Sequence, residues 1–186
     1  MRMTRFVMGT VAISLASWTV QAQDFNGNGH GNRPFRVSAE LRPSHEVPAV
    51  SSPAEGHFSA VIDDAANDIT YELTFSGLQA PVTQSHIHFA QPNVNGNIVV
   101  WLCGTATNPG PAGTQTCPQS GTISGVIHGT DIQNVPTQGI ATGEFDELVA
   151  AIRNGLAYAN VHTAQSPGGE IRGQIRNGNG HDHDLD

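Results

Sequence analysis

The amino-acid sequence predicts an all-β fold, an antiparallel Greek-key sandwich or barrel with one short helix. Two observations support this fold class. Several segments alternate apolar and polar residues with a period of two, which is the pattern of a half-buried strand. Gly, Pro, Asn and Asp separate these segments at short intervals, as they do in antiparallel folds built from many short strands.

The clearest strand candidates are the alternating segments at residues 35–41, 69–75 and 170–176. A continuous apolar run at 97–103 predicts a central strand that is buried on both faces. Shorter strand candidates lie at 57–62, 84–90, 121–128 and 156–163. The number of strands and their short spacing favour two packed antiparallel sheets over a parallel α/β fold.

One segment, residues 144–155, has the periodicity of a helix. Its apolar residues recur at helical spacing, and they are Phe145, Leu148, Val149 and Ile152. Acidic residues occupy the first turn, where they complement the helix dipole, and Asn154-Gly155 is a typical C-terminal stop. We expect a short amphipathic helix that packs across one end of the sandwich.

Residues 1–22 have the pattern of a secretory signal peptide. Arg2 and Arg5 precede an apolar run of about 15 residues, which is short for a bilayer span of about 20. Val20-Gln21-Ala22 then fits the small-x-small cleavage rule. We therefore expect export to the periplasm, the cell surface or the medium, and no membrane span after cleavage.

The mature chain is predicted to be one domain between two low-complexity segments. Residues 23–33 are rich in Gly and Asn, and residues 177–186 are rich in His and Asp, so both are expected to be flexible. The domain itself is expected at residues 34–176. All eight basic residues are Arg and the net charge is −8, which argues against nucleic-acid binding.

Cys103 and Cys117 are the two cysteines of the chain. Export implies an oxidising compartment, in which a single pair of cysteines is expected to form a disulfide. The segment between them is rich in Gly, Pro and Thr and has little apolar surface to hold it in place. A metal-binding or redox thiol pair is the alternative, but the spacing is not that of a CxxC motif.

Histidines carry the main candidate chemistry. In a strand over residues 84–90, His86 and His88 point to one face while Ile87 points to the core. His162 lies on the polar face of a second strand, which it shares with Tyr158 and Asn160. A third imidazole from another strand would complete a three-ligand metal site.

His128 is a fourth candidate ligand, and His45 and His57 have weaker claims because they lie at predicted strand edges or loops. The predicted ion is Cu(II) or Zn(II), since the three Met residues all lie in residues 1–22 and the thiols are expected to be oxidised. The alternative is structural: a histidine at the end of a strand often only bonds a loop carbonyl.

Several short motifs carry a resemblance to a known family. In chain order they are Glu46-Val47-Pro48, Ser76-Gly77-Leu78, His86-Ile87-His88, Tyr158-Ala159-Asn160-Val161-His162-Thr163 and Pro167-Gly168-Gly169-Glu170-Ile171-Arg172-Gly173-Gln174-Ile175. Together they resemble the CHRD domain, a module first described in chordin and frequent in bacterial exported proteins. The resemblance implies a single-domain exported member, and it assigns no activity.

A second resemblance is to copper/zinc superoxide dismutase, through the HxH strand, the Greek-key body, the disulfide and the late histidine. It implies that His86, His88 and His162 match the copper ligands. No metal-bridging histidine or second-metal aspartate can be placed by spacing, so the resemblance does not extend to the zinc half of that site.

Two functions follow from these observations. The first is an exported CHRD-domain binding protein that binds an unknown protein or matrix partner, because no nucleophile and base form a catalytic set. The alternative is a copper- or zinc-binding protein with superoxide-dismutase-like metal chemistry, in which Glu170 or Tyr158 orients an imidazole. A hydrolase is disfavoured because Asp63-Asp64 reads as a turn.

Overall fold

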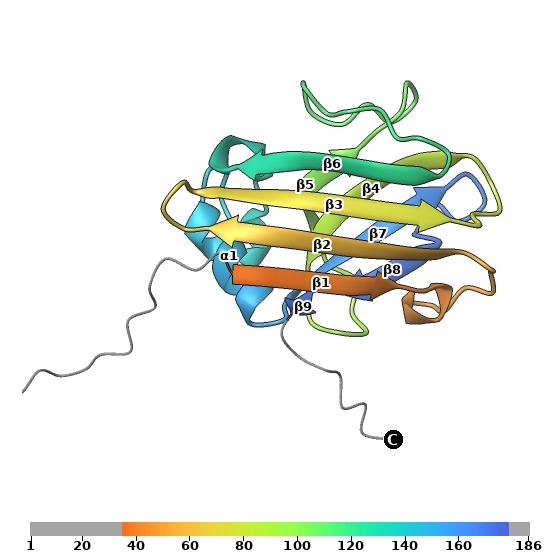
Figure 1. The fold of residues 1–186 in the computed structure, drawn as a ribbon, viewed down its shortest axis with the longest axis horizontal. Helices are drawn as coiled ribbons and strands as arrows, with labels where there is room; N and C mark the ends of the chain where they lie inside the picture. Colours follow the sequence, from red (N-terminus) through yellow and green to blue (C-terminus); the bar gives the residue numbers. More distant parts are fainter. Residues whose placement is uncertain (1–34, 179–186) are drawn as a thin grey trace, which may run out of the picture. The chain divides into compact units, whose positions relative to one another are not determined.

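The computed structural model describes residues 35–178, which form two antiparallel sheets (Figure 1). The predicted signal peptide and the segment at 23–33 lie outside the described residues, as does the tail from residue 179 onward. In Figure 1 the five-stranded sheet lies in front, and the strands of the four-stranded sheet run obliquely behind it. The predicted all-β class with one short helix is confirmed.

The first sheet has the strand order β6-β3-β2-β1-β9. Its strands are β1 (Phe35–Leu41), β2 (Glu55–Asp63), β3 (Asp68–Ser76), β6 (Gly121–His128) and β9 (Arg176–Asn177). The second sheet has the order β5-β4-β7-β8. Its strands are β4 (Val82–Phe89), β5 (Asn97–Cys103), β7 (Ala157–Thr163) and β8 (Ile171–Gln174). Short 3₁₀ turns lie at Pro43–His45, Gly129–Asp131 and Pro136–Gln138.

The chain passes from one sheet to the other by a Greek-key connection. After β3 it enters the second sheet, forms the β4–β5 pair, and returns as β6 beside β3. On the opposite side the sheets are joined, because Arg42 and Arg172 exchange two backbone hydrogen bonds of 3.0 and 3.2 Å.

Alternation along the strands builds one hydrophobic core between the sheets. In β3 every second residue is buried, from Ile69 to Phe75, while the residues between them are exposed. The inner face of the second sheet supplies Ile87, Ala159 and Val161 to the same cluster. Each fully buried aliphatic side chain of this kind stabilises the fold by about 1.5–3 kcal/mol. The period-two pattern therefore fixes which face of each strand is buried.

The helix α1 (Phe145–Arg153) is in the predicted place. Its apolar face is buried, and Glu144 and Asn154 are its N-cap and C-cap residues. At its C-terminal end Arg153 pairs with Asp64 at 2.6 Å and lies over the Phe35 ring. These contacts place the helix at the end of the first sheet where β1 begins and β2 turns into β3, as Figure 1 shows.

The expectation of a single strand at 170–176 is wrong. The segment splits into β8 and β9, which belong to different sheets, and the buried Ile175 lies between them. At Gly173 the strand approaches β1 so closely that a Cβ atom would collide with the carbonyl oxygen of Glu40. Alternation alone could not show that this strand changes sheets.

The predicted disulfide between Cys103 and Cys117 is present, with an S–S distance of 2.02 Å. It closes a segment that projects beyond the sheets at the top of Figure 1. Gly110 of this segment packs on the Trp101 ring. Within residues 35–178, no helix is both long enough and apolar enough to cross a membrane.

Candidate metal centre

The outer face of the second sheet carries a set of polar and aromatic side chains. In β7 the residues Ala157, Ala159 and Val161 belong to the hydrophobic core, whereas Tyr158, Asn160 and His162 point the other way. The strand register brings residues of four strands into two rows. One row is Arg172, Asn160, His86 and Trp101, and the other is Gln174, Tyr158, His88 and Ile98.

His86, His88 and His162 come together on this face, as the sequence predicts for side chains on one side of two strands. Each ring offers one nitrogen, and these three atoms all lie within 4.8 Å of one another. All three residues are buried, with exposed fractions of 0%, 7% and 5%. The second sheet is therefore buried on this outer face as well as on its core face at these positions.

Two backbone carbonyls fix the orientation of two of these rings. His88 Nδ1 lies 3.0 Å from Gly96 O, and His162 Nδ1 lies 2.9 Å from Pro167 O. Because a carbonyl oxygen only accepts, each Nδ1 carries the proton and each Nε2 keeps its lone pair. His86 Nδ1 then donates to His162 Nε2 across 3.2 Å, which leaves the lone pair of His86 on its own Nε2.

The rings are neutral at pH 7 because burial disfavours their charged forms. Burial lowers the pKa of His86 to about 2, with the neighbouring His162 and His88 adding to the shift. Burial also lowers the pKa of His88 to about 4, against the opposing effect of its hydrogen bond to Gly96. The pKa of His162 is lowered by burial as well. A neutral imidazole is the form that binds a metal ion.

Several buried acceptors on this face have no donor. Among the described residues, His86 Nε2, His88 Nε2 and Asn160 Oδ1 have no hydrogen-bond partner. Asn160 is 1% exposed and is the register partner of His86. A buried polar group without a partner costs about 1–3 kcal/mol. The two ring nitrogens belong to the same histidine group, and a cation is the kind of partner that would satisfy them.

Aromatic rings enclose the cluster. The Trp101 ring meets the His86 ring edge-on with centroids 4.3 Å apart. Tyr158 stacks in parallel on His88, with ring centroids 4.7 Å apart and an interplanar angle of 3°. These rings shield the imidazoles from water and restrict their rotation.

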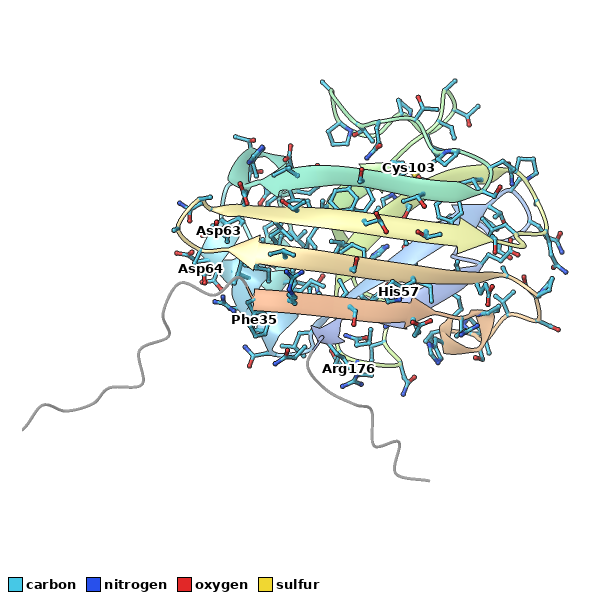
Figure 2. The ribbon with its side chains drawn as sticks, viewed as in Figure 1. Phe35, His57, Asp63, Asp64, Cys103 and Arg176 are labelled. Atoms are coloured by element: carbon cyan, nitrogen blue, oxygen red, sulfur yellow. A yellow bond between two sulfur atoms is a disulfide. The ribbon has the colours of Figure 1, made fainter. Side chains whose placement is uncertain are left out.

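The other candidate histidines do not join the cluster. His128 is exposed at the end of β6 in the first sheet, where its backbone N–H donates to Asp131. His45 is exposed in the 3₁₀ turn after β1. His57 is exposed on β2 and pairs with Glu40 at 2.8 Å (Figure 2).

The acidic candidates have structural contacts. Glu170 accepts hydrogen bonds from Ser52, Thr163 and the Gln79 backbone, and none of these three donors is an imidazole. Asp63 and Asp64 lie at the turn after β2, where Figure 2 labels them. Asp63 accepts two backbone N–H groups of that turn, which agrees with the predicted turn role.

The fold and the site define an all-β domain with a buried three-histidine cluster. The family model of the CHRD domain matches residues 37–175, so the chain belongs to the CHRD family. No curated protein and no solved structure matches the chain in the corresponding comparisons. The resemblance to copper/zinc superoxide dismutase has no support from these comparisons.

Sequence reasoning missed the residues that orient the imidazoles. Gly96 and Pro167 act through backbone carbonyls, which have no signature in side-chain chemistry. The sequence indicates only a buried strand for Trp101, and it assigns Asn160 and Arg172 no role at the site. Asn160 on β7 and Arg172 on β8 alternate with core residues such as Ala159, Val161 and Ile171, and this alternation could have placed both on the polar face.

Proposed function

We propose that this CHRD-family protein binds one transition-metal ion through His86, His88 and His162. The observation that supports this proposal is the set of three buried neutral imidazoles, with ligand atoms within 4.8 Å and two ring nitrogens without a partner. A fold that keeps such acceptors loses stability in the metal-free state. A bound ion would satisfy all of them at once.

The distances suit a small ion. Two nitrogen ligands about 2.0–2.1 Å from a tetrahedral ion are about 3.3 Å apart. His86 Nδ1 and His162 Nε2 are separated by 3.2 Å, so an ion held by both atoms would replace the hydrogen bond between them, and His86 would then carry its proton on Nε2. His86 can also bind through Nε2, which carries its lone pair, whereas His88 and His162 are held to Nε2 by their carbonyl partners.

The proposed ion is Cu(II) or Zn(II). Imidazole nitrogens suit both ions, and within residues 35–178 the cluster contains no thiolate or thioether that would select a softer one. Three protein ligands leave a further position for water or a small molecule, as at catalytic zinc sites. The proposed role is metal binding, and no reaction is assigned to the ion.

Metal stoichiometry and affinity in the chain from residue 23 onward test this proposal. Elemental analysis after exposure to Cu(II) or Zn(II) and gel filtration is expected to give one ion per chain. Trp18 belongs to the predicted signal peptide, so Trp101 is the single tryptophan of this chain. Because Trp101 touches His86, Cu(II) should quench its fluorescence in a saturable titration.

Variants separate the cluster from the exposed histidines. His86→Ala with His88→Ala is expected to abolish the stoichiometric ion, whereas His128→Ala is the matched control and should retain it. Binding that survives the double substitution and is lost in His181→Ala with His183→Ala would contradict the proposal. It would place the ion on the C-terminal tail.

Export is part of the proposal. The Cys103–Cys117 disulfide supports it, because such bonds persist in oxidising compartments. The binding of a protein or matrix partner remains a prediction. Among the described residues, Val94 and Val126 are the exposed large aliphatic side chains, and no partner surface is proposed from them.

A further inference from the structure

Arg172 lies beside the histidine cluster in an unusual environment. It belongs to β8, is 2% exposed and has its guanidinium carbon 3.4 Å from the centre of the Tyr158 ring. Its NH1 donates to Asn95 Oδ1 at 3.2 Å, and its NH2 donates to Val94 O at 2.9 Å. Among the ion pairs of residues 35–178, none involves Arg172.

The contacts of Arg172 converge on one loop. Residues 90–96 connect β4 to β5, and the guanidinium bonds a side chain and a backbone carbonyl of this loop. Asn95 in turn donates to Val47 O at 2.9 Å. A planar fork of donors is suited to holding two acceptors in a fixed arrangement. The hydrogen bonds of Arg172 thus hold this loop in place.

The same loop orients His88. Gly96 is the last residue of the loop, and its carbonyl oxygen accepts the Nδ1 proton of His88 at 3.0 Å. Its backbone N–H donates to the Tyr158 hydroxyl at 3.4 Å. A Cβ atom at Gly96 would collide with Phe89 O, so the loop returns against β4 very closely. The loop therefore determines where the lone pair of His88 points.

Arg172 is also connected to the face of the His88 ring through the ring of Tyr158. The Tyr158 ring lies between the guanidinium on one side and the imidazole on the other, with distances of 3.4 Å and 4.7 Å. Arg172 is thus connected to His88 by two routes, through the Tyr158 stack and through the Gly96 carbonyl. The Gly96 carbonyl fixes the tautomer of His88, and both routes restrict the orientation of the ring.

We propose that Arg172 is a positioning residue of the metal centre, which fixes loop 90–96 and Tyr158 so that His88 presents its Nε2 lone pair to the ion. This inference rests on the proposed metal binding. Outer contacts that orient a ligating histidine typically change metal affinity by 10–100-fold. Arg172→Met is therefore expected to weaken binding of Cu(II) or Zn(II) by that factor.

Arg172→Lys tests whether geometry or charge matters. Lysine keeps the positive charge but lacks the planar fork that stacks on Tyr158 and reaches two acceptors. We expect its metal affinity to fall nearly as far as that of Arg172→Met. Arg153→Lys is the matched control, because Arg153 also lies over an aromatic ring, that of Phe35, at 5.0 Å, but its partners Phe35 and Asp64 belong to β1 and the β2–β3 turn rather than to loop 90–96. It should bind as the unchanged protein does.

Imidazole NMR of the metal-free protein measures the tautomer of each histidine. This tautomer would not change if Arg172 only stabilised the fold. Long-range ¹H–¹⁵N spectra report which nitrogen of each histidine carries the proton. In the unchanged protein His88 should show a fixed Nδ1–H form, and in Arg172→Lys it should show exchange between tautomers. The signals of His162, which is held by Pro167 O, should stay as they are.

A milder variant keeps the test decisive if the Arg172 variants fold poorly. Asn95 is exposed, and Asn95→Ala removes one acceptor of the guanidinium without opening the core. It should weaken metal binding severalfold and broaden the His88 signals. Unchanged affinity and unchanged His88 spectra in Arg172→Lys and Asn95→Ala would overturn the inference. Absence of metal binding in the unchanged protein would instead overturn the proposed function, and the NMR result would still decide the role of Arg172.

Discussion

The buried carboxyl group of Glu46 is expected to make the unfolding free energy of the protein depend on pH. Glu46 is 6% exposed, and its carboxylate lies against Gly169, with Oε1 lacking a hydrogen-bond partner among the described residues. Burial raises its pKa to about 7, even though Arg172 and a backbone hydrogen bond from Val47 act in the other direction. Tyr158 is the other titratable group that interacts with it.

The raised pKa has a definite consequence for stability. A carboxyl group that holds its proton more tightly when folded makes the protein less stable as pH rises from its unfolded pKa through its folded pKa. From 4.5 to about 7 the full loss is about 3 kcal/mol at 1.36 kcal/mol per pKa unit. About 2.5 kcal/mol of this loss falls between pH 5 and pH 8.

Glu46→Gln removes this titration while preserving the shape of the side chain. Relative to the unchanged protein, the variant should therefore gain about 2.5 kcal/mol of unfolding free energy between pH 5 and pH 8. Urea denaturation at the two pH values measures the difference, and Glu55→Gln, at an exposed glutamate, is the control. A gain below about 0.5 kcal/mol, or a loss, would refute the reasoning.

Two further predictions concern the scaffold. Replacing Cys103 and Cys117 by Ala should lower the unfolding free energy by about 3 kcal/mol in urea, because the bond closes a loop of about 15 residues; a loss under about 1 kcal/mol would contradict the chain-entropy account. Gly173→Ala should destabilise by about 3 kcal/mol through its collision with Glu40 O. An unchanged melting temperature would show that β1 and β8 can separate without cost.

The fold class and the histidine face could be predicted because alternation along a strand is a local property. The period of two placed His86 and His88 opposite Ile87, and it placed His162 with Tyr158 and Asn160. That β7 lies beside β4 could not be predicted, since more than sixty residues separate the two strands. This non-local pairing is what turns two strand motifs into one cluster.

The burial of the cluster could not be predicted for a related reason. The groups that orient the imidazoles are backbone carbonyls of nearby loops, Gly96 O for His88 and Pro167 O for His162, and a carbonyl group is the same in every residue. Arg172 reads in the sequence as an exposed residue of an alternating strand, yet it is buried against Tyr158. Its burial depends on loop 90–96 folding over the sheet, which no local pattern encodes.

The central claim is that His86, His88 and His162 together hold one metal ion. Crystals of the copper-loaded chain, measured at the copper absorption edge, test it most directly. The account predicts a single strong anomalous peak about 2.0 Å from one nitrogen of each of these three rings. The account would be contradicted by a peak at other residues, with the three histidines keeping their hydrogen bonds to each other and to the carbonyls of Gly96 and Pro167.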